Sequence, residues 1–213
     1  MLSRTADHLF WMSRYTERAE NTARMLNVGY ETSLLPQSTA KAQEGWLGLL
    51  SISELIPAYT ARHGAVTRDG VLDFMVRDGN NPSSILSCLR GARENARAVR
   101  GALTTEVWET QNQTWLELHR QLEGGAFERD PGQFFEWVKY RSHLSRGVVL
   151  GTMLQDEAFH FLRMGTFLER ADNTARLLDV KFHAVKNDFF GRPSDRNQES
   201  DFYHWSAILR SVS

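Results

Sequence analysis

Apolar side chains recur along this chain every three or four residues, as in α-helices, and no stretch alternates as a strand does. Helices are expected over residues 5–34, 40–62, 81–103, 104–124, from 130 onward, and over 155–187. The pattern predicts an all-α fold, a single bundle of six or seven helices with almost no strand.

Proline and capping residues set the expected ends of these helices. Pro36 ends the first helix, and Pro57 is expected to kink or end the second. Asn81 or Ser83 caps the third helix and Asp130 caps the fifth, each next to a proline that the first helical turn tolerates.

The connecting segments are less regular. Residues 64–81 are expected to form a connector with a short apolar piece, 71–76, that can be a short helix. Residues 187–200 are polar and read as a loop. The last segment, 201–213, has helical spacing and stops without a cap. Its apolar side chains Trp205, Ile208 and Leu209 are expected to need a partner surface, which a second copy of the chain can supply by self-association.

One sequence motif occurs twice. The first copy reads Glu17-Arg18-Ala-Glu-Asn-Thr-Ala-Arg24, and the second reads Glu169-Arg170-Ala-Asp-Asn-Thr-Ala-Arg176. Aligning residues 8–28 with 160–180 gives identity at roughly half of the positions. The chain is therefore expected to contain a duplicated helix and an internal pseudo-twofold repeat.

Each copy has an apolar face and, beside it, a polar stripe. The apolar face consists of Met12, Tyr15, Ala19, Thr22 and Leu26, and in the second copy of Met164, Phe167, Ala171, Thr174 and Leu178. The polar stripe consists of Glu17, Glu20, Asn21 and Arg24, and in the second copy of Glu169, Asp172, Asn173 and Arg176. In both stripes an acid precedes an arginine by four residues, the favourable order for an ion pair within a helix.

Two interpretations of the polar stripe remain open: a solvated face with surface ion pairs, or a specific polar contact between the copies. If the two helices pack about a local twofold, we expect them to run antiparallel, with Glu17 near Arg176 and Glu169 near Arg24. A parallel arrangement would place like charges side by side. The asparagine of each stripe would lie midway and hydrogen-bond across the axis.

The two motif copies resemble the signature of the bacterial alpha-E domain family, an all-helical family named for its recurring Glu-Arg motif. Other stretches are also similar to that family: Met1-Leu-Ser-Arg-Thr-Ala-Asp7, Trp11-Met-Ser-Arg-Tyr15, Asn81-Pro-Ser-Ser-Ile85, Arg93-Glu-Asn-Ala-Arg97 and Phe161-Leu-Arg-Met-Gly165. The resemblance covers nearly the whole chain. It implies one helical domain over residues 1–213 that ends short of the family's usual C-terminus.

The resemblance also implies partners. Members of the family typically occur beside, or fused to, a circularly permuted ATP-grasp enzyme of the amide-ligase type. Transglutaminase-like proteins and a proteasome-related peptidase often accompany them. An ATP-grasp amide ligase, and with it a transglutaminase-like protein, is therefore the expected partner in a bacterial peptide-modification system. The resemblance assigns no catalytic role to the Glu-Arg positions.

Composition narrows the class of protein. The 213 residues are 41% hydrophobic with a net charge of −1, which suits one globular domain and argues against binding nucleic acid through bulk charge. The single cysteine, Cys88, stands beside Leu89 and is expected to be buried and slow to react. No apolar run approaches a membrane span, and Asp7 and His8 interrupt any signal-peptide core, so a cytoplasmic location is expected.

Common catalytic and cofactor-binding motifs are absent from the sequence. Glu157-Ala-Phe-His160 has the spacing of a di-metal ligand pair, but no second Glu-x-x-His occurs. His160, like His8 at the equivalent position, is expected to be a core histidine. No zinc pattern, nucleophilic serine elbow or phosphate-binding glycine loop occurs, so neither a metal nor a cofactor is expected.

Four arginines form a row beside the apolar face of the third helix: Arg90, Arg93, Arg97 and Arg100. They are the best candidates for binding an anion, because guanidinium groups bind phosphates and carboxylates in bidentate fashion. Alternatively, the row pairs with the acidic stripes of the two motif helices or is simply solvated.

The sequence supports two hypotheses for function. The leading one is a non-catalytic accessory or scaffold partner of an ATP-grasp amide ligase. The alternative is an enzyme of the same pathway that uses the acids Glu17, Glu20, Glu169 and Asp172 and holds an anionic substrate with Arg24, Arg176, Arg93 and Arg97. Carboxylates open to solvent would favour the enzyme, and a cluster closed over by side chains would favour the accessory role.

Overall fold

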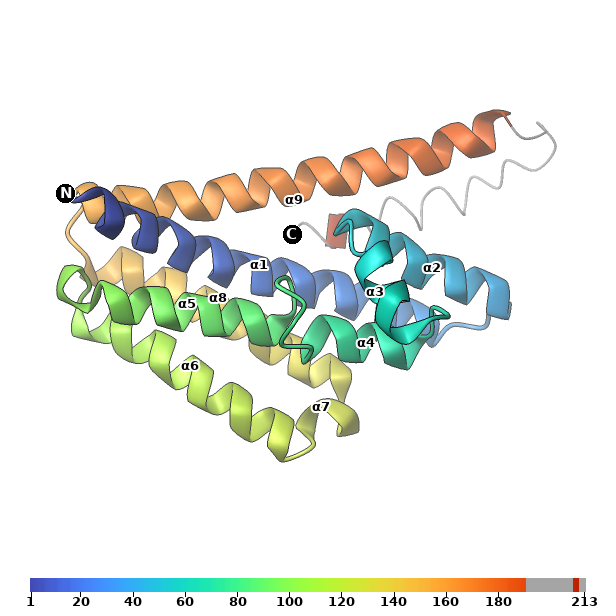
Figure 1. The fold of residues 1–213 in the computed structure, drawn as a ribbon, viewed down its shortest axis with the longest axis horizontal. Helices are drawn as coiled ribbons and strands as arrows, with labels where there is room; N and C mark the ends of the chain where they lie inside the picture. The colour runs from blue at the N-terminus through green and yellow to red at the C-terminus, as the bar shows by residue number, and fades with distance from the viewer. Residues whose placement is uncertain (191–208, 211–213) are drawn as a thin grey trace.

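The computed structural model of the protein describes the backbone of residues 1–190 and 209–210 and the side chains of residues 1–180 and 209–210. The long helices form an elongated bundle (Figure 1): α1 (Ser3–Ser33), α5 (Ile85–Ala98), α6 (Thr105–Glu123), α8 (Pro131–Thr152) and α9 (Glu157–Phe190). The shorter elements are α2 (Thr39–Ile52), α3 (Ile56–His63), α4 (Arg68–Val76), the 3-10 turn η1 (Arg100–Ala102) and α7 (Ala126–Arg129). The described residues contain no strand, so the all-α prediction is confirmed.

The described part contains nine α-helices, more than the six or seven that were predicted. The stretch 40–62 breaks at residues 53–55, where Glu54 adopts a left-handed φ of 57°. Helix α3 then begins with Pro57 in its first turn, where a proline is tolerated. The predicted connector 64–81 contains α4, a helix of nine residues that Thr67 caps. The expectation of a short helix at the apolar piece 71–76 is confirmed.

Polar side chains cap five of the helices. In each case the side chain accepts a hydrogen bond from the backbone N–H three residues on, and the caps are Ser38, Thr67, Ser84, Thr104 and Asp130. The predicted cap at Asp130 is confirmed, whereas Ser84 replaces Asn81 and Ser83 at the start of α5. Asn81 instead braces the preceding turn, because its buried amide donates to the carbonyl of Phe74 and accepts from the backbone of Ser83.

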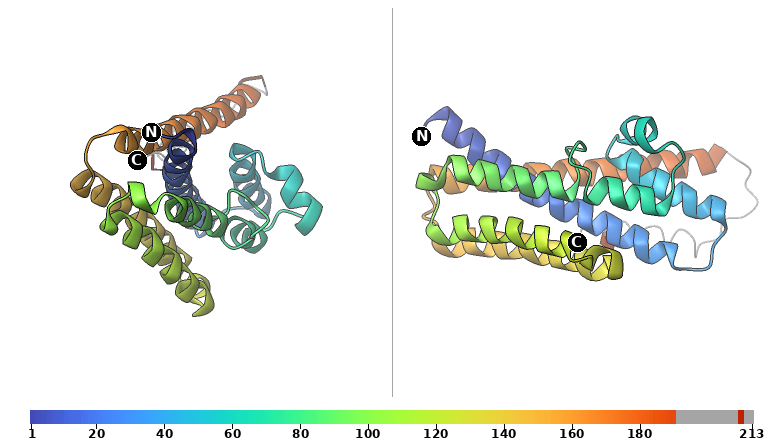
Figure 2. Two further views of the ribbon diagram at one scale, coloured as in Figure 1. Left: turned by 60° about the vertical axis from the view of Figure 1, so that its left-hand side comes forward. Right: turned by 60° about the horizontal axis from the view of Figure 1, so that its bottom comes forward.

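Helix α1 lies at the centre of the bundle and packs against α9, α5, α8 and α2 (Figure 2). The apolar face predicted for the first motif copy is confirmed, with Met12, Ala19 and Leu26 at most 1% exposed. Since neighbours surround α1, its polar stripe is buried as well.

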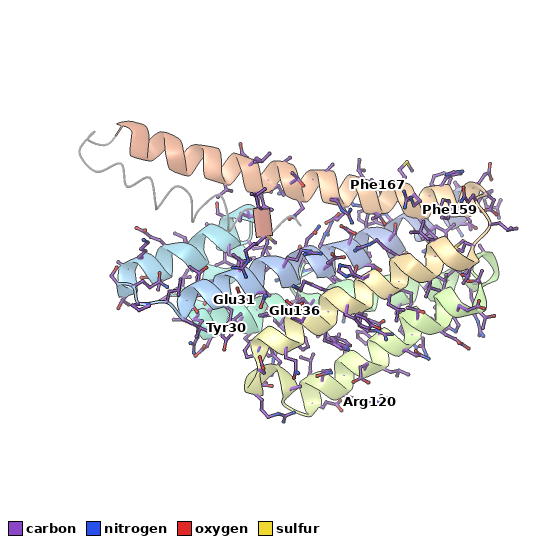
Figure 3. The ribbon with its side chains drawn as sticks, turned by 180° about the vertical axis from the view of Figure 1, so that it is seen from behind. Tyr30, Glu31, Arg120, Glu136, Phe159 and Phe167 are labelled. Atoms are coloured by element: carbon purple, nitrogen blue, oxygen red, sulfur yellow. The ribbon has the colours of Figure 1, made fainter. Side chains whose placement is uncertain are left out.

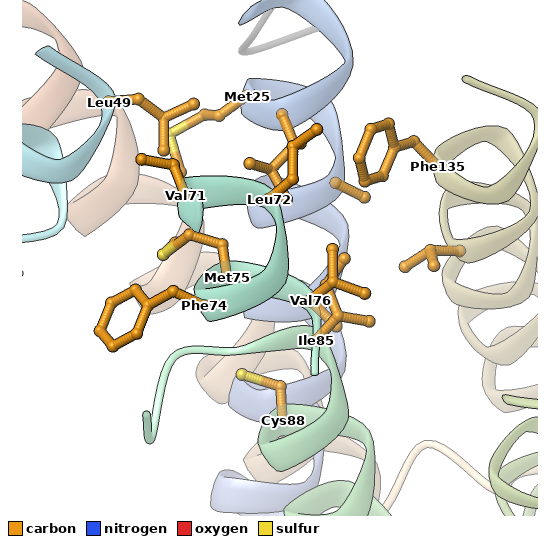
Figure 4. Close-up of a cluster of buried hydrophobic side chains, with 14 of the residues drawn as sticks. Met25, Leu49, Val71, Leu72, Phe74, Met75, Val76, Ile85, Cys88 and Phe135 are labelled. Carbon is orange, nitrogen blue, oxygen red and sulfur yellow. The ribbon is translucent and has the colours of Figure 1, made fainter. Parts of the chain in front are cut away.

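Two hydrophobic clusters fill the bundle. The larger one joins the C-terminal half of α1 to α2, α4, α5 and α8, around Leu49, Phe74 and Met75 (Figure 4). The smaller one joins the start of α1 to α8 and α9. Cys88 lies in the larger cluster and is fully buried, as predicted, and this burial raises the pKa of its thiol to about 12. The expectation of slow thiol labelling therefore stands as a prediction.

The second motif copy turns a different face inward. Its predicted apolar face is wrong, because Met164, Phe167 and Leu178 are 48–49% exposed. His160, predicted to lie in the core, is exposed, whereas His8 is half-buried and its ring hydrogen-bonds to Asn95. The physical reason is that α9 lies at the edge of the bundle and presents only one narrow side to α1.

The C-terminal expectations fall largely outside the described residues. Helix α9 continues to Phe190, past the predicted end at residue 187, while the predicted loop to residue 200 and the apolar Trp205 and Ile208 lie outside the described part. Leu209 is 66% exposed, and Arg210 pairs with Glu31. Within the described residues, no helix combines the length and the apolar character needed to cross a membrane.

Candidate functional site

Helices α1 and α9 run in the same direction. The amino group of Met1 lies 2.7 Å from Oε2 of Glu157, at the start of both helices. Further along, Arg18 pairs with Glu169, so the contact partners advance together. Figure 1 shows the same parallel course. The predicted antiparallel arrangement is therefore wrong.

The adjacent glutamate and arginine of each motif exchange partners across this helix pair. Nε of Arg170 donates to Oε1 of Glu17 at 2.8 Å. In the reciprocal pair, Nε of Arg18 donates to Oε1 of Glu169 at 2.6 Å and its Nη2 donates to Oε2 at 3.0 Å. Parallel helices do bring the two glutamates to the same level. The arginine next in sequence removes the repulsion, because it reaches the other helix's glutamate.

Further basic side chains reach the acids of α1. Arg146 of α8 donates to Glu17 at 2.9 Å and also to Glu20. Arg24 pairs with Glu20 at 2.7 Å, and Nε2 of His143 lies 3.1 Å from the same carboxylate. Helix α8 is thereby joined to α1 through charged groups.

The acids of α9 are paired in a similar way. Arg14 donates to Oε2 of Glu169 at 2.6 Å and approaches Asp172 at 3.9 Å. Arg176 lies 3.1 Å from Asp172 and 2.9 Å from Glu54, which follows α2. We call the groups that join α1, α8 and α9 the Glu-Arg cluster: Arg14, Glu17, Arg18, Glu20, Arg24, Arg146, Glu169 and Arg170.

Sequence reasoning found part of this cluster. The pairs within one helix, Glu20 with Arg24 and Asp172 with Arg176, are confirmed. Arg14 was missed, although it precedes Arg18 by one helical turn and the same spacing could have found it. Arg146 could not be found from the sequence, because nothing in the sequence shows that α8 packs beside the first motif.

The acids of the Glu-Arg cluster are buried. Glu17 and Glu20 are each 2% exposed and Glu169 is 4% exposed. Burial by itself would raise the pKa of Glu20, but the hydrogen bond and the charge of Arg146, with smaller contributions from Ser142 and Arg24, lower it to about 2. A carboxylate with so low a pKa stays ionised at neutral pH and is poorly suited to general acid–base catalysis. Side chains therefore cover these three carboxylates almost completely, whereas Arg170 of the cluster is partly exposed.

The arginine row lies apart from the cluster. Arg93 and Arg97 each pair with Glu94 of α5 at 2.7 Å, and Arg90 and Arg100 are exposed. Among the described residues, none of the four pairs with an acid of the motif helices, so that alternative is wrong. Anion binding by this row remains a prediction.

A polar cleft of about 170 Å³ opens beside the Glu-Arg cluster, between α1, α9, the α2–α3 connection and the residue before the cap of α5. Asn21 and Asn173, at equivalent positions of the two motifs, both line it. In the described part of the chain no hydrogen bond joins these two asparagines, contrary to the prediction, and Nδ2 of Asn21 has no partner. We use the name polar cleft for this site below.

Histidines and acids do not assemble into a metal site in the part of the chain that the structure describes. Glu157 pairs with the N-terminal amine, and the exposed His160 makes an edge contact with the ring of Phe159.

Together, the fold and the Glu-Arg cluster define a helical bundle domain in which two copies of one motif hold two parallel helices together. A family model described as a predicted alpha-helical domain with a conserved ER motif matches residues 1–213. The chain belongs to this family, Alpha-E.

The relatives are longer proteins without an assigned function. The chain is 29% identical to an uncharacterised protein of Mycobacterium bovis. The matched region covers 86% of this chain and 23% of the relative. An uncharacterised protein of Mycobacterium tuberculosis (strain ATCC 25618 / H37Rv) is 25% identical with the same coverage. The chain thus spans about a quarter of the length of the curated relatives it matches. No solved structure matches it.

Proposed function

We propose that this domain is a non-catalytic accessory or scaffold partner of an ATP-grasp amide ligase in a bacterial peptide-modification system. The burial and pairing of the carboxylates in the Glu-Arg cluster is the observation that carries the non-catalytic part. Arg146 and Arg170 hold Glu17, and Arg14 and Arg18 hold Glu169, so these groups are engaged in fixing the helices. A cytoplasmic location and a transglutaminase-like further partner belong to the same proposal.

The length of the relatives supports a role beside another protein. The chain matches only 23% of the relative from Mycobacterium bovis, so a domain of this type can be one part of a longer polypeptide. Domains joined in this way meet other domains through exposed surfaces.

The outer face of α9 is the surface that we assign to the ligase. Its large apolar side chains are 48–50% exposed: Met164, Phe167, Leu168 and Leu178. By helical spacing, Met164, Phe167 and Leu178 lie on the side of α9 opposite the buried Glu169, and Leu168 lies at the flank of that side. Figure 3 marks the position of Phe167 on α9. The guanidinium carbon of Arg163 lies 4.6 Å from the centre of the Phe167 ring. An apolar stripe with a cationic rim favours a partner surface that is apolar and edged by acids.

Co-expression with an ATP-grasp amide ligase from the same organism, followed by size-exclusion chromatography, tests this proposal. We expect the wild-type domain to co-elute with the ligase. The double variant Phe167→Ser, Leu168→Ser should lose at least about tenfold in affinity, since central apolar contacts contribute most to binding.

The matched control is Leu116→Ser with Tyr140→Ser, because these side chains are 46% and 62% exposed and belong to α6 and α8. The control should bind the ligase as the wild type does. Absence of a complex with the wild-type chain, or an equal loss in the control, would contradict the proposal.

The second candidate is an enzyme of the same pathway. One observation favours it: the polar cleft reaches Glu169 and Asp172, and the side chain of Asp172 is 42% exposed. If the domain is the enzyme, Asp172→Asn should abolish turnover while the complex with the ligase persists. If it is the accessory partner, turnover by the complex should not change.

A further inference from the structure

We infer that the polar cleft between α1 and α9 binds a small neutral or zwitterionic ligand that contains an amide group and is about the size of a dipeptide. The site stands independently of the proposed function, because its lining belongs to this chain alone.

The asparagines of the two motifs are the first observation. Asn21 is 7% exposed and lines the polar cleft, and its Nδ2 makes no hydrogen bond with the described residues. Asn173 faces the same cleft from α9 and is 9% exposed. A buried amide without a partner destabilises the folded state, so it calls for an explanation beyond packing.

A primary amide offers two N–H donors and a carbonyl acceptor. A 180° rotation about the bond to the amide carbon exchanges the two ends, so Asn21 can present either a donor or an acceptor to a ligand. Two such groups side by side match the N–H and C=O of a ligand amide better than they match an ion of one sign.

The charges of the lining point the same way. The lining contains three carboxylates and two guanidinium groups: Glu54, Glu169, Asp172, Arg18 and Arg176. Arg14, which lies outside the lining, pairs with Glu169 and approaches Asp172. Each of the three carboxylates therefore has an arginine partner. Charges that are already paired attract phosphate or a polyamine only weakly, whereas a zwitterion can find a group of each sign.

The volume limits the ligand. The polar cleft holds about 170 Å³, which corresponds to roughly a dozen water-sized positions. A dipeptide, with about ten non-hydrogen atoms, matches this size, and a nucleotide does not.

A strained backbone conformation occurs in the lining of the polar cleft. Glu54 lines the cleft with a φ of 57°, a left-handed conformation that non-glycine residues rarely adopt. Its carboxylate pairs with Arg176 of α9 at 2.9 Å, and this contact joins the α2–α3 connection to the opposite wall. Strained residues of this kind concentrate at binding sites.

Titration of the full 213-residue chain, followed by NMR of the asparagine side-chain amides, tests the inference. The probes are alanyl-alanine and N-acetylalanine N-methylamide, with inorganic phosphate and putrescine as comparisons. We expect at least one amide probe to give saturable shifts of the Asn21 and Asn173 signals, and we expect neither comparison probe to do so.

Asn21→Leu should weaken binding of the amide probe at least tenfold and leave the melting temperature unchanged or higher, because it removes an unpartnered amide. The matched control is Asn27→Leu, also on α1 and 8% exposed, whose amide donates to Glu31 and Glu136 outside the cleft. The control should lower the melting temperature and retain binding.

Three results would each overturn the inference. They are the absence of saturable shifts with both amide probes, binding of phosphate or putrescine as tight as that of the amides, and wild-type affinity in Asn21→Leu. Because no ligase is present in this experiment, its outcome is separate from that of the co-elution test.

Discussion

Glu20 shows how neighbouring basic side chains stabilise a buried carboxylate in this protein. It is 2% exposed, and its carboxylate meets Arg146, Arg24 and His143. Buried ion pairs add little net stability compared with apolar side chains, but removing one partner leaves a costly unpaired charge. The residue therefore fixes which helices meet more than it adds to the free energy of folding.

Acid should destabilise the protein through Glu20. Its pKa is about 2 in the folded state and near 4.5 without those contacts. As the pH falls, the Glu20 carboxylate becomes protonated in the unfolded chain at a higher pH than in the folded chain. The stability due to Glu20 is therefore complete above pH 4.5 and is lost as the pH falls toward 2. The difference corresponds to about 3 kcal/mol. Urea unfolding between pH 6 and pH 2.5 measures it.

Glu20→Gln should lower stability at neutral pH and lose part of this acid dependence, since it cannot take up the proton. Glu44→Gln, at an exposed position of α2, should keep the wild-type dependence. An identical loss on acidification in the wild type and in Glu20→Gln would show that Glu20 is not held ionised in the folded state.

At the scale of helices, close approach of α1 and α9 depends on small residues. A Cβ atom at Gly165 would lie 2.2 Å from Oγ of Ser13 and 2.3 Å from the carbonyl oxygen of Phe10. Ser13 and Gly165 hold the same position in the two motif copies. The two helices therefore contact each other through a small residue of each copy, one turn before the exchanged Glu-Arg pairs.

Gly165→Ala should separate the two helices, because the backbone carbonyl of Phe10 cannot move without α1. We expect a loss of about 3 kcal/mol in the free energy of unfolding. Gly147→Ala provides the control, because that glycine lies inside α8 with open space around it. It should stabilise the protein by up to about 1 kcal/mol through helix propensity. Equal stability of Gly165→Ala and the wild type would contradict the close approach.

The helices themselves could be predicted from the sequence, but their surroundings could not. Periodicity and caps located the long helices, whereas the two motif copies show what such patterns miss. Met12 is 1% exposed and its counterpart Met164 is 48% exposed, although both belong to the same motif. Leu26 and Leu178 differ in the same way. Burial depends on whether neighbours surround a helix, and that is a property of the tertiary structure.

The candidate site was predictable only within single helices. Glu17, Glu169 and the two asparagines follow from the repeated motif. The direction of α9 does not, because the antiparallel prediction compared whole stripes of charge and overlooked the arginine that directly follows each glutamate. The polar cleft could not be found either, since four separate segments of the chain form it.

Across the whole molecule, the Glu-Arg cluster fixes the position of α9. This helix lies at the edge of the bundle, supplies one wall of the polar cleft and exposes the apolar stripe that we assign to a partner. Both proposed surfaces therefore depend on the same charged contacts between α1 and α9. Loss of the reciprocal pairs should disturb the cleft and the stripe together.

A double-mutant cycle on Glu17 and Arg170 is the sharpest test of that reciprocal pairing. Urea unfolding of Glu17→Gln, Arg170→Gln and the double variant should give a coupling free energy of about 1–3 kcal/mol, as for residues in one ion-pair network. The reference cycle pairs Glu17 with Arg176, which contacts Asp172 and Glu54 instead. It should give less than about 0.5 kcal/mol. Coupling that is absent with Arg170, or stronger with Arg176, would contradict the parallel exchange of the Glu-Arg pairs.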